Sequence, residues 1–249
     1  MPRYFLELSY KGEKYSGFQV QQNAVTIQSE VEKAFAVFFR KTVELTGSSR
    51  TDTGVHALQN YFHFDWQDEF PQQAIYNLNA ILPADIVIKS VKEVASDAHC
   101  RFHATAREYK YFIYDAKNPF IDDRAWYFPY KLNIDHLNSC AQKILANKDF
   151  SAFSKRNTQV KTFQCSIIES EWLYEDGCLV YHVKANRFLR GMVRGLVGTM
   201  VRVSRGGMGM AVFEQLLYQP KIASADFSAP ARGLFLIKVS YPGGVFKSI

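Results

Sequence analysis

Cysteine is scarce in this sequence, and no long apolar segment is present. The 249 residues include four cysteines, none of them in a CxxC pair, at positions 100, 140, 165 and 178. This usage is typical of reduced, structural cysteines in a cytosolic protein. The most apolar stretch, 188–203, contains three arginines, so no segment approaches the ~18–20 apolar residues that a transmembrane helix needs. Because the N-terminus also runs directly into a strand-like segment without a signal-peptide core, we expect a cytoplasmic protein with no membrane partner.

Charge and aromatic content are compatible with a nucleic-acid partner. Lys and Arg number 30 against 24 Asp and Glu, which gives a net charge of +6 and a pI near 9.0. This mild excess suits nucleic acid without proving it. The chain also has 20 Phe and 14 Tyr, and aromatic side chains among basic ones suit base stacking, although we expect most of them in the core. With 47% hydrophobic and 22% charged residues, the composition excludes global disorder.

Alternating and helical apolar patterns run through both halves of the chain. In the first half, 1–104, they predict strands at 4–10, 43–46, 57–65 and 86–94 and helices at 26–40 and 71–80. In the second half, 105–249, they predict strands at 107–115, 163–173, 179–185 and 233–241 and helices at 135–146, 187–203 and 212–218. Glu175-Asp-Gly177 is a hairpin signal between two of these strands. The pattern predicts an α+β protein of two similar halves that share one continuous sheet.

A polar loop between two apolar strands is the first place where chemistry is expected. Gly47 and Gly54 bracket the residues SSRTDT, which include Arg50 and Asp52. A nearby arginine favours the ionised form of an aspartate, and an ionised, desolvated aspartate can serve as a nucleophile or general base. From the local residues alone, an Asx-type turn with a surface arginine explains the loop better than a catalytic role does.

Five segments in order resemble the TruA family of tRNA pseudouridine synthases. The polar loop, GSSRTDTGVHA, is similar to that family's G-R-T-D-A-G-V-H-A loop. Three more segments resemble family motifs, namely LSYKGEKYSGFQVQ at 8–21, HCRFHATAREYKYFIY at 99–114 and NRFLRGMVRGLVGTM at 186–200. A tail at 233–236, GLFL, resembles G-L-Y-L. One such segment would be a weak signal, whereas five in order over nearly the whole chain are a specific one.

The resemblance implies a fold and a reaction. The fold is the pseudouridine synthase fold, in which two α/β-sandwich halves share a mostly antiparallel sheet with an active-site cleft between them. The reaction breaks the N1–C1′ bond of a uridine in tRNA, turns the uracil and joins C5 to C1′, with no cofactor and no metal. Asp52 matches the catalytic aspartate and is expected to be the nucleophile. Attack on C1′, attack on C6 and a glycal route all remain open, since each needs a carboxylate shielded from water.

The resemblance also implies substrate-binding residues. Tyr109 is expected to stack on the flipped base and to move a proton at C5, whereas Tyr111 and Tyr114 are expected in the core. Arg50 and Arg194 are expected near the aspartate, and Arg101 near the displaced base or its phosphate. Leu234 is expected to form the pocket wall. Two further arginines, at +3 and +4 spacing with Arg194 on the expected 187–203 helix, would contact RNA phosphate, namely Arg187 and Arg190.

Other motifs carry less weight. His99 and His103 have a metal-compatible spacing only in a helix, and because the stretch is predicted to be extended we expect no metal site. The loop Gly206-Gly-Met-Gly209 follows a predicted helix, so it is not a dinucleotide fingerprint. Three departures from the family pattern, at Lys11, Ser49 and Thr53, remove no catalytic group and affect the expected target more than the activity.

The leading hypothesis is an enzyme that acts as a homodimer on the tRNA anticodon stem-loop, at positions 38 to 40 in family usage. Two alternatives remain open at this point: a non-catalytic RNA-binding or tRNA-folding protein, and a pseudouridine synthase for another RNA. A hydrolase that uses Asp52 with His56 has little support, because no nucleophile–base–orienter set is evident.

Overall fold

The computed structural model describes residues 1–155, 160–219 and 225–247, and the chain divides into two compact units. The first unit comprises Met1–Thr105 together with Leu236–Ile249, and the second comprises Ala106–Phe235. The division after residue 105 falls beside the expected boundary at 104. The last part of the chain groups with the first unit, because β9 (Leu234–Ser240) lies beside β3 (His56–Asp65) in the strand order.

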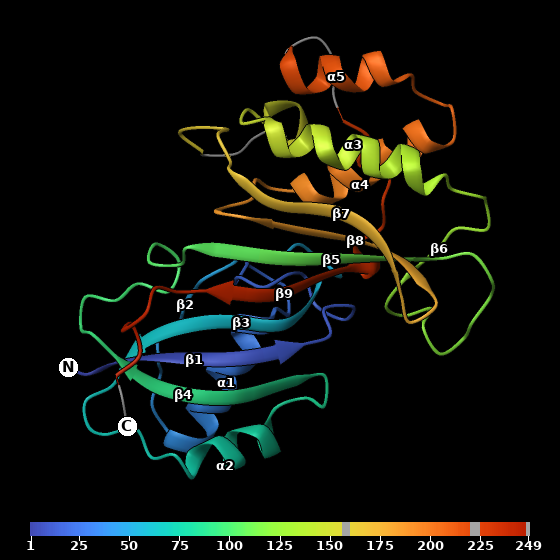
Figure 1. The fold of residues 1–249 in the computed structure, drawn as a ribbon. Coiled ribbons are helices and arrows are strands. Elements are labelled where there is room, and N and C mark those ends of the chain that lie inside the picture. Colours follow the sequence, from blue (N-terminus) through green and yellow to red (C-terminus); the bar gives the residue numbers. More distant parts are fainter. Residues whose placement is uncertain (156–159, 220–224, 248–249) are drawn as a thin grey trace. The chain divides into compact units, whose positions relative to one another are not determined.

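The first unit is an antiparallel sheet with two helices. Its strands follow the order β4-β1-β3, and β2 also pairs with β3. Figure 1 shows α1 behind these strands and α2 beside β4. The other elements of this unit are β1 Arg3–Tyr10, α1 Ile27–Phe39, β2 Thr46–Gly47, α2 Ala74–Ile81 and β4 Ile86–Val94.

Both faces of β3 are covered, so its burial does not alternate as the sequence pattern suggested. On one face, Phe35 of α1 meets Phe64 edge-on at 5.4 Å between ring centroids. On the other face, the segment after β9 packs against the strand, with the Tyr241 ring 5.3 Å from the Tyr61 ring between centroids. Burying each such aromatic ring stabilises the fold by roughly 1.5–3 kcal/mol, so both faces contribute to the core of this unit.

The helix α1 begins directly after its capping residue, Thr26. Thr26 Oγ1 accepts a hydrogen bond from the Ser29 N–H at 3.1 Å, and Ser29 Oγ accepts one from the Thr26 N–H at 2.9 Å. This reciprocal pair satisfies two backbone donors that the first helical turn would otherwise leave without partners. The predicted start at residue 26 is confirmed.

The second unit is an antiparallel sheet with helices packed against it. Its strands follow the order β5-β8-β7, and β6 pairs with β5. The helix α3 packs on β7 and α4, and α5 contacts both helices (Figure 1). The bounds are β5 Ala106–Tyr114, β6 Trp126–Tyr127, α3 Ile134–Ala146, β7 Ile167–Glu175, β8 Cys178–Ala185, α4 Met192–Ser204 and α5 Met210–Tyr218.

Two turns decide how the second unit is built. Asp176 and Gly177 have φ values of 49° and 75°, the positive pair that a two-residue hairpin turn requires, and the predicted hairpin between β7 and β8 is confirmed. Gly191 has φ 72° and precedes Met192, the first residue of α4. The predicted 187–203 helix is therefore too long at its start, because the chain enters α4 through a left-handed residue and not through a helical turn.

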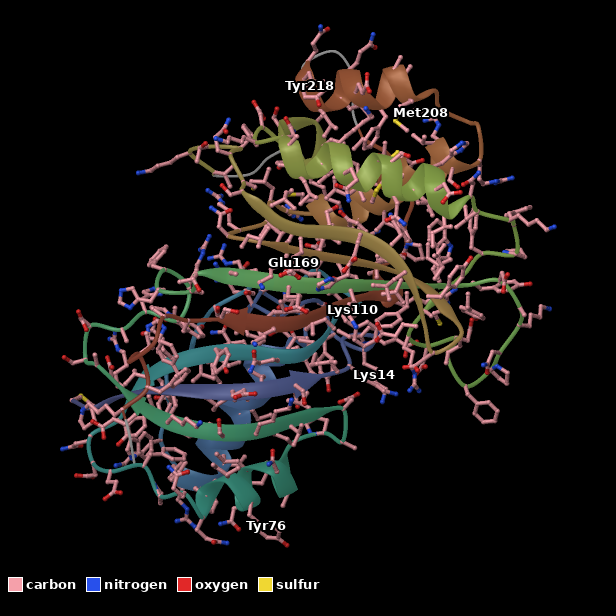
Figure 2. The ribbon with its side chains drawn as sticks, viewed as in Figure 1. Lys14, Tyr76, Lys110, Glu169, Met208 and Tyr218 are labelled. Carbon is pink, nitrogen blue, oxygen red and sulfur yellow. The ribbon has the colours of Figure 1, made fainter. Side chains whose placement is uncertain are left out.

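One face of the second sheet carries paired charges. Lys110 donates to Glu175 Oε1 at 2.8 Å, and Lys184 donates to Glu169 Oε1 at 2.8 Å. Figure 2 shows Lys110 on β5 and Glu169 on β7. The opposite face bears Tyr109, Tyr111 and Val183, which are buried, so the candidate tyrosine lies on the helix-covered face.

No helix within residues 1–155, 160–219 and 225–247 is both long and apolar enough to cross a membrane.

Candidate active site

Asp52 lies in a loop whose backbone is held on both sides. Before it, the Thr51 carbonyl accepts a hydrogen bond from the Phe18 N–H at 3.1 Å. After it, the Val55 N–H donates to the Asp52 carbonyl at 3.1 Å and closes a turn. Thr51 is buried, Asp52 is half-buried and Arg50 is exposed. The loop therefore presents a partly accessible carboxylate from a fixed main chain, which is the arrangement a positioned nucleophile needs.

A buried hydrogen-bond network supports the loop from below. The Tyr10 hydroxyl lies 2.8 Å from Thr51 Oγ1 and accepts a hydrogen bond from Asn60 Nδ2 at 3.2 Å. The second amide proton of Asn60 goes to the Ser49 carbonyl at 2.9 Å. Asn60 is fully buried, so these bonds replace its hydration. Sequence reasoning did not assign Tyr10 or Asn60 to the site, although an amide within an apolar strand was a usable signal.

The 8–21 segment packs directly on the loop, and two of its glycines make this possible. A Cβ on Gly12 would lie 1.9 Å from the Val55 carbonyl oxygen. Gly17 has φ 92°, and a Cβ there would lie 3.0 Å from the Thr51 carbonyl oxygen. Only glycine permits this approach of the two backbones. The structure thus brings together two of the resembling segments, 8–21 and 47–57, in the first unit.

Arg101 and the residues around it form a turn. The His103 N–H donates to the His99 carbonyl at 3.0 Å, and the Arg101 N–H donates to His99 Nδ1 at 3.1 Å. The expectation that this stretch is extended is wrong, because these local bonds curl it. Arg101 itself is exposed, with its guanidinium 5.7 Å from the centre of the Phe102 ring.

Tyr109 stands on β5 in the second unit, beneath the helices. It is buried, with 8% of its surface exposed, and Phe188 meets its ring edge-on at 5.0 Å. Tyr111, two residues on, points to the same face and is fully buried, and its hydroxyl donates to the Pro230 carbonyl at 2.7 Å. Burial raises the pKa of the Tyr111 hydroxyl far above its ordinary value. Tyr111 and Tyr114 are core residues, as expected, and Tyr109 keeps a slightly exposed ring.

Arg194 projects from the first turn of α4 toward the same region of the second unit. Its Nε donates to the Ala229 carbonyl at 2.7 Å, which fixes the guanidinium plane. Its positive charge acts against the rise in the pKa of the Tyr111 hydroxyl that burial causes. Leu234 is buried, and a Cβ on the preceding Gly233 would lie 2.8 Å from the Tyr111 ring. The expected pairing of Arg194 with Asp52 stays a prediction.

Arg187 and Arg190 do not share a helix face with Arg194. Both precede the start of α4 and lie in the loop between β8 and that helix. The Arg190 carbonyl accepts a hydrogen bond from the Lys155 N–H at 3.0 Å. Arg187 is half-buried and Arg190 is exposed. The prediction of an arginine stripe at +3 and +4 spacing is therefore wrong, since Gly191 interrupts the helical path.

The expected site residues divide between the two units. Asp52, Arg50 and Arg101 belong to the first unit. The second unit holds the expected base-stacking, phosphate-binding and wall residues, namely Tyr109, Arg187, Arg190, Arg194 and Leu234.

Comparison with known proteins identifies the family. A family model described as tRNA pseudouridine synthase matches residues 8–103 and 140–242. A relative from Bacteroides fragilis, named tRNA pseudouridine synthase A, is 41% identical over 98% of this chain and 98% of its own length. Proteins of the same name from Parabacteroides distasonis and Staphylococcus aureus are 37% and 35% identical, over 99% and 95% of this chain and 98% and 90% of their own lengths. The chain belongs to the tRNA pseudouridine synthase family.

Proposed function

We propose that this protein isomerises uridine to pseudouridine at positions 38 to 40 of the tRNA anticodon stem-loop, with Asp52 as the nucleophile. Membership of the family supports an isomerase of this class. The observation that carries the role of Asp52 is its half-buried carboxylate on a loop whose backbone is bonded on both sides. A surface turn without a catalytic task would not require the buried Tyr10–Asn60 network beneath it.

The reaction conserves every atom of the base and sugar except for an exchanged proton. The N1–C1′ bond breaks, the uracil turns within the site, and a C5–C1′ bond forms. The hydrogen on C5 leaves as a proton, and N1 gains one. Asp52 stabilises or traps the separated fragment, whether it attacks C1′, attacks C6 or supports a glycal. Water must be excluded while the fragment is free, since hydrolysis would otherwise release uracil.

Tyr109 is proposed to serve both the flipped base and the C5 proton. Its ring is held edge-on by Phe188, so it offers a fixed flat surface to uracil. Its hydroxyl carries the proton between C5 and solvent. Replacing Tyr109 with phenylalanine keeps the ring and removes the proton carrier. We expect Tyr109→Phe to lower kcat by about 10²–10⁴ with an almost unchanged tRNA affinity.

A matched tyrosine controls for the loss of a hydroxyl elsewhere. Tyr218 lies on α5 with 59% of its surface exposed, and Figure 2 labels it on that helix. Single-turnover kinetics and filter binding should show no change for Tyr218→Phe. A Tyr109→Phe variant with full kcat would contradict the proton-carrier role while leaving stacking possible.

Arginines are proposed to hold the RNA. Arg50, Arg101 and Arg190 are exposed, and exposed guanidinium groups bind phosphate bidentately. The half-buried Arg187 and Arg194 are proposed to contact the target nucleotide and its neighbours. A net charge of +6 is modest for one chain, and a homodimer would present the positive charge of two chains to one tRNA. We propose that the protein acts as a homodimer in the cytoplasm.

Product analysis tests the proposal. The protein is incubated with tRNA transcripts that keep uridine at only one of positions 38, 39 or 40, and the RNA is digested to nucleosides. Pseudouridine should form with the wild type and be absent with Asp52→Ala, which should still bind tRNA. Free uracil would indicate hydrolysis, and binding with no product in either form would indicate an RNA-binding protein. Product from another RNA alone would overturn the tRNA assignment.

A further inference from the structure

Two histidines and a cysteine that the proposed reaction does not use converge in the first unit. His63 lies on β3, and His99 and Cys100 lie in the turn that follows β4. One potential ligand atom from each residue lies within 4.8 Å of the other two. His63 Nδ1 is 3.2 Å from Cys100 Sγ, and the two imidazole rings are 4.5 Å apart between centroids. Residues far apart in the sequence thus place three metal-ligating groups around one point.

The spacing suits a tetrahedral metal ion. Zinc binds imidazole nitrogen at ~2.0–2.1 Å and thiolate sulfur at ~2.3 Å, so two such ligands lie roughly 3.5 Å apart. The observed 3.2 Å between His63 Nδ1 and Cys100 Sγ is close to that value. Small movements of the His99 side chain, which is only half-buried, complete the triangle. A thiolate with two imidazoles selects a soft or borderline ion and not magnesium or calcium.

A cavity lies beside one of the three residues, His63. His63 and Thr46 line a cavity of about 430 Å³ in the first unit, together with Arg3 and Asp65. Arg3 would repel a cation, but its guanidinium donates to both Asp65 oxygens at 2.7 and 2.8 Å, which offsets its charge. Cys100 is fully buried, and of the three proposed ligands it is His63 that lines this cavity. The fourth position of a metal bound here would take a water molecule.

The hydrogen bonds that Cys100 and His99 make in the absence of a metal can be replaced by bonds to a metal ion. The Cys100 thiol donates to the Thr46 carbonyl at 3.1 Å, and His99 Nδ1 accepts from the Arg101 N–H. Binding a divalent ion releases the thiol proton to solvent and forms the metal–sulfur bond, so the balance is one ion bound for one proton lost. The Arg101–His99 bond is given up when the imidazole lone pair turns to the metal.

We propose that His63, His99 and Cys100 form a zinc(II) site. The metal would join β3 to the turn that carries Arg101, and so fix the backbone of a proposed RNA-binding residue. This role is structural, since Asp52 is not among the ligands. The inference does not depend on the proposed reaction and can fail or hold independently of it.

Cobalt(II) provides a direct probe because a thiolate–cobalt bond gives a near-ultraviolet charge-transfer band. Untagged wild-type protein is reduced, stripped with a chelator and titrated with cobalt(II) and then zinc(II). We expect the band to saturate at one equivalent and zinc to abolish it. No band in the wild type would overturn the proposal.

Matched variants locate the site. Cys100→Ala should lose the band, while Cys178→Ala, which removes a buried cysteine of the second unit, should keep it. A band that persists in Cys100→Ala would overturn the proposal. If Cys100→Ala fails to fold by circular dichroism, His99→Gln decides, because its side chain is half-buried. Zinc affinity measured by chelator competition should fall for His99→Gln and be unchanged for His136→Gln, which alters an exposed histidine of the second unit, and equal affinities would reject the site.

Discussion

At the residue scale, the proposed catalytic groups are held in place by other side chains. Asp52 is the proposed nucleophile, but the Tyr10 hydroxyl and the Asn60 amide fix the residues before it. Tyr109 is the proposed proton carrier, and Phe188 fixes its ring. Catalytic groups need this support because a small displacement from the reacting geometry costs much of the rate.

The Tyr10 hydroxyl is predicted to stabilise the loop. Tyr10→Phe removes the partner of Thr51 Oγ1 and of one Asn60 amide proton, and both residues are buried. Leaving buried polar groups without partners costs about 1–3 kcal/mol, so urea unfolding should show a loss of that size. Tyr76→Phe is the control, since Tyr76 is 72% exposed on α2 (Figure 2) and should change stability by less than about 0.5 kcal/mol. Equal stabilities of the two variants would contradict the network.

Two buried thiols predict a stability that falls in alkali. Burial raises the pKa of Cys140 to about 12 and that of Cys165 to about 11, from a model-compound value of 9.0. The unfolded chain therefore loses these protons first as the pH rises above 9, and the folded state becomes less favoured until the native thiols ionise. By pH 10 we expect a loss of roughly 1 kcal/mol per thiol.

The contribution of one thiol to the loss of stability in alkali is measured by comparing the wild type with a variant that lacks that thiol. Urea unfolding of the wild type and of Cys140→Ala is measured at pH 8 and pH 10. Cys140→Ala should show the smaller decrease between the two pH values, whatever its stability at pH 8. Parallel decreases would mean that the thiol does not contribute.

At the element scale, local signals predicted the existence and type of most helices and strands. The β4 bounds, the Thr26 cap of α1 and the β7–β8 turn agree with the sequence pattern, because each depends on residues close in the chain. The start of α4 could not be predicted in this way. Gly191 takes a left-handed conformation that the apolar spacing from 187 onward does not reveal, so Arg187 and Arg190 were misplaced.

The site residues that the sequence pattern did not predict are brought together by contacts between segments that are distant in the chain. The polar loop and its aspartate were found from the sequence, but Tyr10 and Asn60 were not assigned as its supports. The cluster of His63, His99 and Cys100 was also not foreseen, since the turn at 99–103 brings the latter two beside β3. These arrangements depend on strand pairing and on turns, which periodicity alone does not determine.

Contact between the 8–21 segment and the aspartate loop makes Gly12 a sensitive position. An alanine Cβ would overlap the Val55 carbonyl, and the obstacle is backbone that cannot rotate away. We expect Gly12→Ala to destabilise the protein by about 3 kcal/mol or more. Gly209→Ala is the matched control, because its φ is −73° and no atom lies within 4 Å of the added carbon. A Gly12→Ala protein as stable as this control would contradict the packing.

At the scale of the whole molecule, family membership and the two sets of site residues lead to one function. The family match covers 8–103 and 140–242, so it includes both Asp52 in the first unit and Arg194 in the second. We claim that the reaction, and with it the loss of the uracil C5 proton, requires Asp52 as the nucleophile.

Tritium release from C5-tritiated uridine in tRNA tests that claim most directly. Pseudouridine formation requires the C5 hydrogen to leave, whereas binding and glycosidic hydrolysis do not. Tritium should be released to water by the wild type and by a folded control such as Tyr76→Phe, and should not be released by Asp52→Ala that still binds the tRNA. Release by Asp52→Ala at the wild-type rate, or no release by a wild type that binds the tRNA, would contradict that claim.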